Sequence, residues 1–387
     1  MQVQKSFKGQ SNYGTLYLVP TPIGNLQDMT FRSVQILKEV DLICAEDTRN
    51  TGLLLKHFEI ETKQYSFHEH NAYEKIPDLL ERLKSGLSLA QVSDAGTTSV
   101  GMLAEFGEKR VKDTPISEAA IAGAAVGSAI TGLRPIVDLT FMDFITIALD
   151  AIVNNGAKNN YMFGGGLKTP VTFRVASGSG IGSAAQHSQS LESWLTHIPG
   201  IKVVAPGNAN DAKGLLKSAI QDNNIVIFME PKALYGKKEE VTQDPDFYIP
   251  LGKGEIKREG TDLTIVTYGR MLERVLKAAE EVAEQGINVE VVDPRTLVPL
   301  DKELIFESVK KTGKLMLVND AYKTGGFIGE IAAMVTESEA FDYLDHPIVR
   351  LASEDVPVPY ARVLEQAVLP DVEKIKAAII KMANKGN

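Results

Sequence analysis

The chain has 387 residues, of which 44% are hydrophobic and 24% charged, a composition typical of a globular protein with two or three domains. Its 41 basic and 50 acidic residues give a formal net charge of -9, which argues against general electrostatic binding to nucleic acid or to an anionic membrane. The single cysteine, Cys44, lies in the apolar run LICAE and is expected to be a buried free thiol, and no apolar run is long enough to span a membrane, so we expect a cytoplasmic protein without membrane contact.

The first part of the chain alternates short apolar runs with helical patterns. We expect strands at TLYLVP, DLICAE, KQYSFH and LSLAQVS. The clearest helical pattern covers residues 72–86, with one apolar face made of Ile76, Leu79, Leu80 and Leu83. Such alternation predicts a parallel sheet, whose ligands bind beyond the carboxyl ends of the strands, where the loops PTPIGN, EDTRNT and SDAGTT lie.

The same alternation continues after residue 98. We expect a helix at residues 118–132, the strand RPIVDLTF, a long helix from residue 143, the strands VTFRVASG, KVVAPG and IVIFME, and a helix at residues 209–223. Residues 231–262 contain three prolines and a charge cluster, which predicts a linker with an edge strand. A further series of strands and helices follows, so we expect an α/β protein divided into residues 1–97, 98–235, a linker at 236–262, and 263–387.

Three loop motifs characterise the N-terminal part, namely PTPIGNLQDMT, AEDTR and VSDAGT. In this order they resemble the first domain of the ribosomal-RNA ribose 2'-O-methyltransferases of the tetrapyrrole-methylase class, which use S-adenosylmethionine, over residues 14–97. The resemblance implies a cofactor and RNA cleft lined by Pro22, Gly24, Asn25, Glu46, Asp47, Arg49, Asp94, Ala95 and Gly96. The alternative is that the glycines are turn residues and that Asp28 and Asp47 cap helices.

This resemblance stops inside the fold. Thr98 stands where the family has a proline, and the second methyltransferase domain is not found after it. Because methyl transfer depends on positioning both reactants in a closed cleft, we expect no methyltransferase activity, no S-adenosylmethionine cofactor and no RNA partner.

Residues 98–387 carry a second set of motifs: DTPISE, GLRPI, AAQHSQS, PGIKVVAPGNANDAKGLLKSAIQDNN and VVDPRTLVPLD. They closely resemble the beta subunit of the thiamine-diphosphate-dependent first component of 2-oxo acid dehydrogenase complexes, a group that includes pyruvate, branched-chain and acetoin enzymes. The resemblance implies a pyrimidine-binding domain and a transketolase-like C-terminal domain behind a truncated methylase-type domain. The whole chain is thus an apparent chimera, joined near residues 96–100.

Glu118 is, by this resemblance, the catalytic carboxyl that bonds the pyrimidine ring nitrogen of the cofactor. Its sequence neighbours Ile116, Ala119, Ala120 and Ile121 are apolar, and desolvation by them is expected to raise its pKa. The alternative is a structural glutamate at a helix N-terminus, stabilised by the helix dipole.

The resemblance assigns further roles. His187 is expected to exchange a proton with the substrate or the lipoyl group, and Phe144 to pack against the pyrimidine; the alternatives are a capping or packing histidine and a core phenylalanine. A structural potassium ion would take its oxygen ligands from Val171, Ala219, Asp222 and Asn224. Asp222 and Asn224 alternatively form a helix C-terminal turn.

The resemblance also implies what the chain needs from outside. The magnesium site that holds the diphosphate lies on an alpha subunit, so an α2β2 heterotetramer and a lipoyl-bearing acyltransferase core are the expected partners. The expected function is decarboxylation or cleavage of pyruvate or acetoin with acyl transfer to the lipoyl carrier, the alternatives being a methyltransferase fragment and an inactive fusion. Because the first strand and helix of this family are replaced, we expect an exposed sheet edge unless the methylase-type strands cover it.

Overall fold

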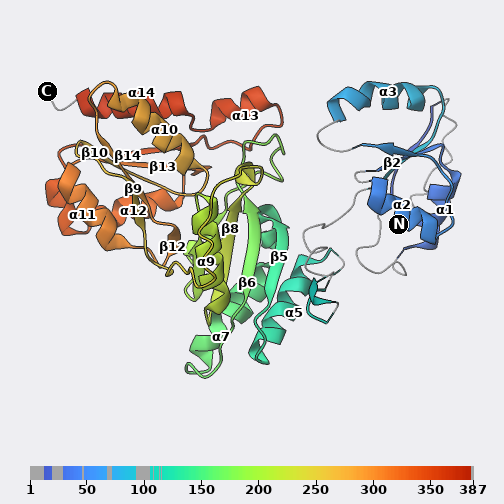
Figure 1. The fold of residues 1–387 in the computed structure, drawn as a ribbon, viewed down its shortest axis with the longest axis horizontal. Coiled ribbons are helices and arrows are strands. Elements are labelled where there is room, and N and C mark those ends of the chain that lie inside the picture. The colour runs from blue at the N-terminus through green and yellow to red at the C-terminus, as the bar shows by residue number, and fades with distance from the viewer. Residues whose placement is uncertain are drawn as a thin grey trace, which may run out of the picture. The chain divides into compact units, whose positions relative to one another are not determined.

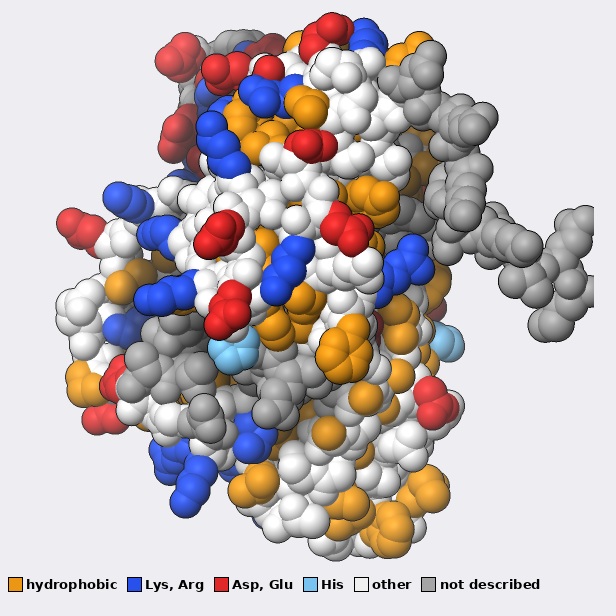
Figure 2. All heavy atoms as spheres, turned by 90° about the vertical axis from the view of Figure 1, so that its right-hand side faces the viewer, with side chains coloured by type: hydrophobic (Ala, Val, Ile, Leu, Met, Phe, Trp, Pro, Cys, Tyr) orange, Lys and Arg blue, Asp and Glu red, His pale blue; other side chains and the backbone are white. Residues whose placement is uncertain are grey.

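The computed structural model describes residues 13–19, 29–45, 48–67, 72–92, 105–107, 109–112, 114 and 116–384. The chain divides into two compact units, Met1–Ser117 and Glu118–Asn387, each described here by itself. Within the described ranges, no helix is both long and apolar enough to cross a membrane. On the face drawn in Figure 2, basic and acidic side chains are interspersed.

The N-terminal unit has a four-stranded parallel sheet in the order β1-β4-β2-β3, as the alternation predicted. Its elements are β1 (Leu16–Leu18), α1 (Phe31–Glu39), β2 (Leu42–Ala45), α2 (Thr48–His57), β3 (Gln64–Ser66), α3 (Ala72–Lys84) and β4 (Leu89–Val92). Leu37, Ile43 and Val92 belong to its core. Cys44 is buried as predicted, and burial raises the pKa of its thiol to about 11, so it is not a reactive thiolate.

Helix α3 differs from the prediction in the face that it buries. Leu79 and Leu83 pack with Leu42, Cys44 and Leu89 of the sheet, whereas Ile76 and Leu80 are exposed. The four apolar residues form two adjacent rows with a spacing of four residues, and only the row of Leu79 and Leu83 faces the strands.

The larger unit contains two sheets (Figure 1). The first has the order β12-β7-β8-β6-β5, and all its neighbours are parallel except β12. Its elements are α5 (Glu118–Ile130), β5 (Ile136–Phe141), η3 (Met142–Phe144), α6 (Ile145–Leu149), the π-helical η4 (Asp150–Gly156), α7 (Ala157–Met162), β6 (Thr172–Ser177), α8 (Glu192–Thr196), β7 (Ile201–Val204), α9 (Ala209–Gln221), β8 (Ile225–Pro231), η5 (Lys232–Leu234) and β12 (Thr296–Val298).

The second sheet has the order β14-β13-β10-β11-β9. Its elements are β9 (Glu255–Arg258), β10 (Leu263–Thr267), α10 (Met271–Ala283), β11 (Val289–Asp293), α11 (Lys302–Thr312), β13 (Leu315–Tyr322), α12 (Phe327–Thr336), η6 (Glu339–Tyr343), β14 (Val349–Ser353), α13 (Arg362–Val368) and α14 (Val372–Ala383). The antiparallel strand β9 is the edge strand expected in the linker. One hydrophobic core includes residues of both sheets, such as Phe173, Ile227, Val266 and Leu317.

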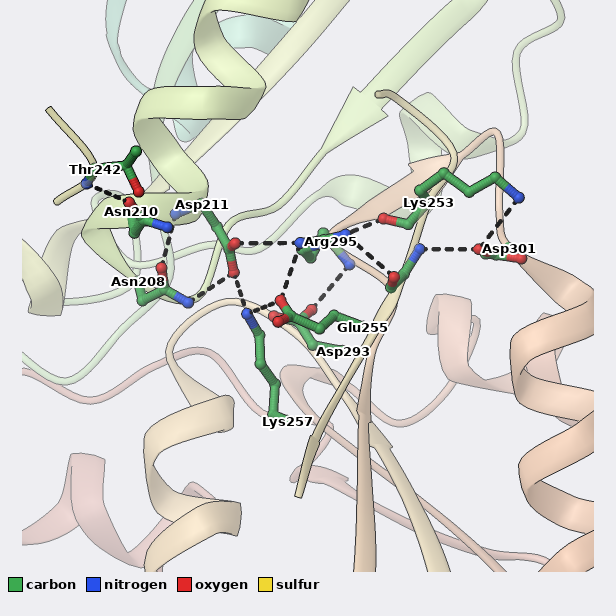
Figure 3. Close-up of polar contacts among 11 residues, drawn as sticks. Asn208, Asn210, Asp211, Thr242, Lys253, Glu255, Lys257, Asp293, Arg295 and Asp301 are labelled. Atoms are coloured by element: carbon green, nitrogen blue, oxygen red, sulfur yellow. Dashed lines mark hydrogen bonds and ion pairs between the residues drawn. The ribbon is translucent and has the colours of Figure 1, made fainter. Parts of the chain in front are cut away.

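A cluster of buried charges also joins the two sheets (Figure 3). Asp211, in the first turn of α9, accepts a 2.6 Å hydrogen bond from Lys257 on β9 and a 3.3 Å bond from Arg295. Asp211 is 2% exposed, and Glu255 contacts both cations from the outer side. The two sheets are therefore fixed to each other by ion pairs as well as by apolar contacts.

Strand β5 forms the edge of its sheet, and Ile130, Leu133 and Ile136 beside it are exposed. Among the described residues, no strand pairs with the outer side of β5.

Candidate active site

The first sheet of the larger unit brings three chain segments to one edge. Strands β5, β6 and β8 are parallel neighbours, so their carboxyl ends lie together. Phe144 follows β5, residues 178–190 with His187 follow β6, and Lys232 follows β8. This is the edge at which ligands bind in open α/β sheets.

Glu118 reaches the same edge from the preceding helix. Helix α5 packs on β5, and a short connection reverses the chain between them, so the first turn of α5 lies at the carboxyl end of the strand (Figure 1). Glu118 itself is buried, with 9% of its surface exposed. Of its apolar sequence neighbours, Ile121 lies one turn further on, is half-buried and packs against the core, whereas Ile116 is 71% exposed and Ala119 and Ala120 are exposed as well. Successive helix residues point about 100° apart, so they do not share the environment of Glu118.

His187 lies in an aromatic cluster. The centroid of its ring lies 5.1 Å from that of Phe141 and 5.5 Å from that of Phe144, both in edge-on geometry. The structure therefore brings together two of the residues that the sequence selected, His187 and Phe144. Because His187 is only half-buried, its ring is accessible to a ligand at this edge.

The loop that carries His187 is anchored by the second sheet and its helices. Gly180 and Gly182, with φ of 98° and 79°, donate 2.6 Å and 3.1 Å hydrogen bonds from their amides to the buried carboxylate of Glu365 on α13. The Arg270 guanidinium donates to the carbonyl of Ser179. Positive φ values favour glycine at these two positions, and their amides thereby become available to one carboxylate.

A second polar cluster lies behind this loop. Tyr268 donates a 2.9 Å hydrogen bond to Glu192 and accepts a 3.0 Å bond from Asn319. Burial, and next the nearby charge of Asp320, raise the pKa of Glu192 to about 7. Glu192 is therefore a buried carboxyl that ionises near neutral pH.

This raised pKa predicts a pH-dependent stability. The folded state binds the proton of Glu192 more tightly than the unfolded chain, so its stabilising contribution is complete below about pH 4.5 and is lost as the pH rises through about 7. Replacing Glu192 by glutamine, which is neutral at every pH, should leave stability at pH 4.5 nearly unchanged and raise it relative to the wild type by about 3 kcal/mol at pH 8. Urea unfolding across this pH range measures the difference. The exposed Glu284→Gln serves as control, and an equal offset at all pH values would refute the assignment.

Hydrogen bonds link three of the residues selected for potassium, Ala219, Asp222 and Asn224, and Val171 is bonded to the following strand at Val226. Val226 donates a 2.9 Å hydrogen bond to the carbonyl of Val171, and Asp222 a 3.2 Å bond to that of Ala219. The Asp222 carboxylate accepts bonds from Asn224 and pairs with Lys202. The set offers carbonyl oxygens and one carboxylate, which are ligands that a hard cation prefers.

The residues selected for the methyl-donor cleft are not placed by the structure. Pro22, Gly24, Asn25, Glu46, Asp47, Asp94, Ala95 and Gly96 lie outside the described residues, and Arg49 lies on α2. In the ranges that the structure describes, no group of three or more His, Cys, Asp or Glu side chains could hold a metal ion.

Several residues at this edge were missed by the sequence analysis. They are Asp143, Lys232, Arg270, Asp320 and Glu365, all of which contact or surround the loop at residues 178–190. One signal was available: a lysine directly after an apolar strand, in IVIFMEPK, is placed at the ligand-binding end of a parallel sheet.

The site fits a thiamine-type cofactor in its donor chemistry. A pyrimidine ring suits a carboxyl that can share a proton with the ring nitrogen and apolar or aromatic walls, and this edge offers Glu118 with the rings of Phe141 and Phe144.

Family comparisons match three parts of the chain. The tetrapyrrole (corrin/porphyrin) methylases match residues 15–103, the transketolase pyrimidine binding domain residues 88–238, and the transketolase C-terminal domain residues 252–375. The first two matches overlap around the predicted junction, and both resemblances of the sequence analysis are confirmed.

Curated relatives and a solved structure agree with these matches. The chain is 48% identical over 294 residues to the beta subunit of the pyruvate dehydrogenase E1 component of Rhizobium meliloti (strain 1021), covering 76% of this chain but only 64% of that relative. It is 48% identical to the beta subunit of acetoin:2,6-dichlorophenolindophenol oxidoreductase of Bacillus subtilis (strain 168), covering 73% of this chain and 82% of the relative. The human mitochondrial pyruvate dehydrogenase E1 beta subunit is 44% identical, with coverages of 77% and 84%.

The fold is similar to that of a solved split gene transketolase, described as an inactive beta4 tetramer. The TM-score is 0.63 at 25% sequence identity, and the match covers 75% of this chain and 90% of the other. The chain therefore belongs to the family of beta subunits of the pyruvate dehydrogenase E1 component and the related acetoin oxidoreductase, with transketolase-type pyrimidine-binding and C-terminal domains.

Proposed function

We propose that this chain is the catalytic beta subunit of a thiamine-diphosphate-dependent dehydrogenase that acts on pyruvate or acetoin together with an alpha subunit. The observation that carries the proposal is the shared edge of β5, β6 and β8, where Phe144 and His187 meet and the first turn of α5 places Glu118. The identity of 48% to pyruvate and acetoin enzyme subunits supports the substrate class.

The residues of this chain have distinct roles in the proposal. Thiamine diphosphate, when bound, supplies a carbon nucleophile that attacks the carbonyl of the substrate. Glu118 holds the proton shared with the pyrimidine ring nitrogen, and the ring of Phe144 packs against the pyrimidine. His187 delivers or removes a proton at the substrate oxygen or the lipoyl group. Cleavage of the substrate carbon–carbon bond would release carbon dioxide from pyruvate or acetaldehyde from acetoin. The remaining two-carbon fragment would be oxidised to the acyl level by the lipoyl disulfide, whose S–S bond breaks so that one sulfur takes the acyl group and the other becomes a thiol.

The proposal requires partners. An alpha subunit would supply the magnesium site for the diphosphate and complete an α2β2 heterotetramer, and a lipoyl-bearing acyltransferase core would receive the acyl group. The pyrimidine-binding domain would span residues 98–235 and the C-terminal domain residues 263–387, and the free buried Cys44 suits a cytoplasmic location.

We also propose that the chain is a chimera. The methylase match ends at residue 103, within the match to the pyrimidine binding domain, so the two family matches run into each other over residues 88–103. This observation disfavours the methyltransferase alternative. The other alternative, an inactive fusion, predicts that the chain assembled with an alpha subunit shows no activity.

Cofactor binding tests this proposal before any turnover is measured. We expect the complex of this chain with a pyruvate or acetoin dehydrogenase alpha subunit to bind thiamine diphosphate with magnesium at micromolar Kd in calorimetry. The chain alone should bind at least one hundred times more weakly. An assembled complex that binds no cofactor would refute the proposal.

The proposed potassium site makes a separate prediction. A cation that binds only the folded chain at one hundred times its Kd adds about 2.7 kcal/mol to stability, so the thermal midpoint should be higher in KCl than in NaCl of equal ionic strength. Asp222→Ala should remove the difference. Equal midpoints of the wild type in both salts would show that no such site is present.

A further inference from the structure

We propose that Lys232 is a positioning residue that holds the loop at residues 178–190, and with it the His187 ring, at the cofactor-binding edge. The effect on catalysis rests on the proposed function, whereas the contact between Lys232 and the loop is formed within this chain and needs no partner or cofactor.

Lys232 reaches the loop from the neighbouring strand end. It directly follows β8, and its Nζ donates a hydrogen bond to the carbonyl of His187. The same ammonium lies 5.0 Å from the ring centroid of Phe141, the ring that contacts the His187 imidazole. Only 2% of the Lys232 side chain is exposed. One buried cation therefore contacts both the backbone of His187 and a ring beside its side chain.

Asp143 holds the loop two residues further on. Its Oδ1 accepts a 3.2 Å bond from the amide and a 2.9 Å bond from the side chain of Gln189. Its Oδ2 has no hydrogen-bond partner among the described residues and lies 3.9 Å from Lys232 Nζ. Lys232 and Asp143 thus fix the backbone on both sides of Ser188.

The electrostatics favour positioning over stabilisation. Asp143 on η3, Asp320 on β13 and Glu365 on α13 face the ammonium, yet burial outweighs their attraction and lowers the pKa of Lys232 to about 8. The Lys232 ammonium is therefore still mostly charged at neutral pH, although burial has removed water from around it. Removing one partner of such a buried ion pair leaves the other charge unpaired and lowers stability, whereas removing both charges can be nearly neutral. The effect of the pair is to select one arrangement of the groups that it joins.

Other charged groups complete the surroundings. Arg270 lies 3.8 Å from Asp320, and Tyr322 has a raised pKa, caused first by burial and then by the charge of Asp143. Two cations thus bind the loop at different points: Lys232 donates to the carbonyl of His187, and Arg270 donates to the carbonyl of Ser179 at the start of the loop.

Hydrogen exchange of the full chain at pH 7 tests the contact without any partner or cofactor. In Lys232→Met, the amides of residues 178–190, that of Gln189 in particular, should exchange about tenfold faster, and the thermal midpoint should fall because Asp143 is left unpaired. The double variant Lys232→Met with Asp143→Asn leaves no unpaired charge and keeps an oxygen for Gln189, so it should show the faster exchange with a thermal midpoint within a few degrees of the wild type. Lys232→Arg should recover most of the protection. The matched control is Lys310→Met, at a surface ion pair on α11, which should change neither property. Unchanged exchange in Lys232→Met would overturn the proposal.

The assembled complex tests the catalytic meaning. Lys232→Met should lower kcat between tenfold and one hundredfold while KM for the substrate stays within twofold, because a displaced proton donor affects the reaction more than binding. Arginine should restore activity in part. Faster exchange combined with an unchanged kcat would overturn the positioning role. A wild-type complex without turnover would instead refute the proposed function, and the exchange result would still decide whether Lys232 holds the loop.

Discussion

Glu118→Gln is expected to lower the turnover of the chain assembled with an alpha subunit by a factor of about 100 to 10,000, the range observed when positioned acid–base groups are lost. Glutamine has nearly the same shape as glutamate, so the first turn of α5 should keep its structure. It cannot share a proton with the pyrimidine ring nitrogen, which is the role proposed for this carboxyl. Steady-state kcat, with assembly followed by size-exclusion chromatography, measures the effect.

A control separates this role from the helix-dipole alternative. Glu303 lies in the first turn of α11 and is exposed, so Glu303→Gln loses the same favourable charge at a helix N-terminus without touching the proposed site. This variant should keep normal turnover. If Glu118→Gln also turned over at nearly the wild-type rate, Glu118 would be a structural glutamate.

Asp211→Ala is expected to destabilise the larger unit by about 3 kcal/mol, at the lower end of the range for breaking a buried ion pair from one side. The substitution leaves the mostly buried Lys257 and Arg295 facing each other, with only the half-exposed Glu255 as a partner. It also removes the bond that the Asn208 side-chain amide donates to the Asp211 carboxylate, while the N-cap bond from the backbone amide of residue 211 to Asn208 remains. Urea unfolding measures the loss.

The matched comparison is Glu259→Ala, which removes a surface ion pair with Lys311. This variant should unfold at the same urea concentration as the wild type. If Asp211→Ala matched it, the cluster in Figure 3 would not hold the two sheets together.

Most elements could be predicted because their patterns are local. The alternation of apolar runs and amphipathic helices predicted the parallel strands of all three sheets. Strand β12 was missed because it is only three residues long. It lies in the sequence among the strands of the second sheet but pairs with β7 of the first sheet, and such a long-range contact leaves no periodic pattern. The buried face of α3 was predicted too wide, because the helix has two adjacent rows of apolar residues and only one of them packs on the sheet.

Some residues of the candidate site could be predicted from the sequence, and others could not. The motif resemblance selected Glu118, Phe144 and His187, and the structure places the last two in contact. The residues that anchor the loop could not be found from spacing, because Lys232 is 45 residues from His187 and Glu365 is 185 residues from Gly180 along the chain. The parallel order of β6 and β8 brings Lys232 to the loop, and the packing of the second sheet and its helices against the first brings Glu365 there.

The central claim is that this chain forms the beta half of a thiamine-diphosphate site despite its methylase-type N-terminal part. The most direct measurement is decarboxylation of pyruvate, or cleavage of acetoin, by the full chain assembled with an alpha subunit and supplied with a lipoyl acceptor. We predict turnover that requires the alpha subunit, thiamine diphosphate and magnesium together. A correctly assembled complex that binds the cofactor and gives no turnover with either substrate would contradict the claim.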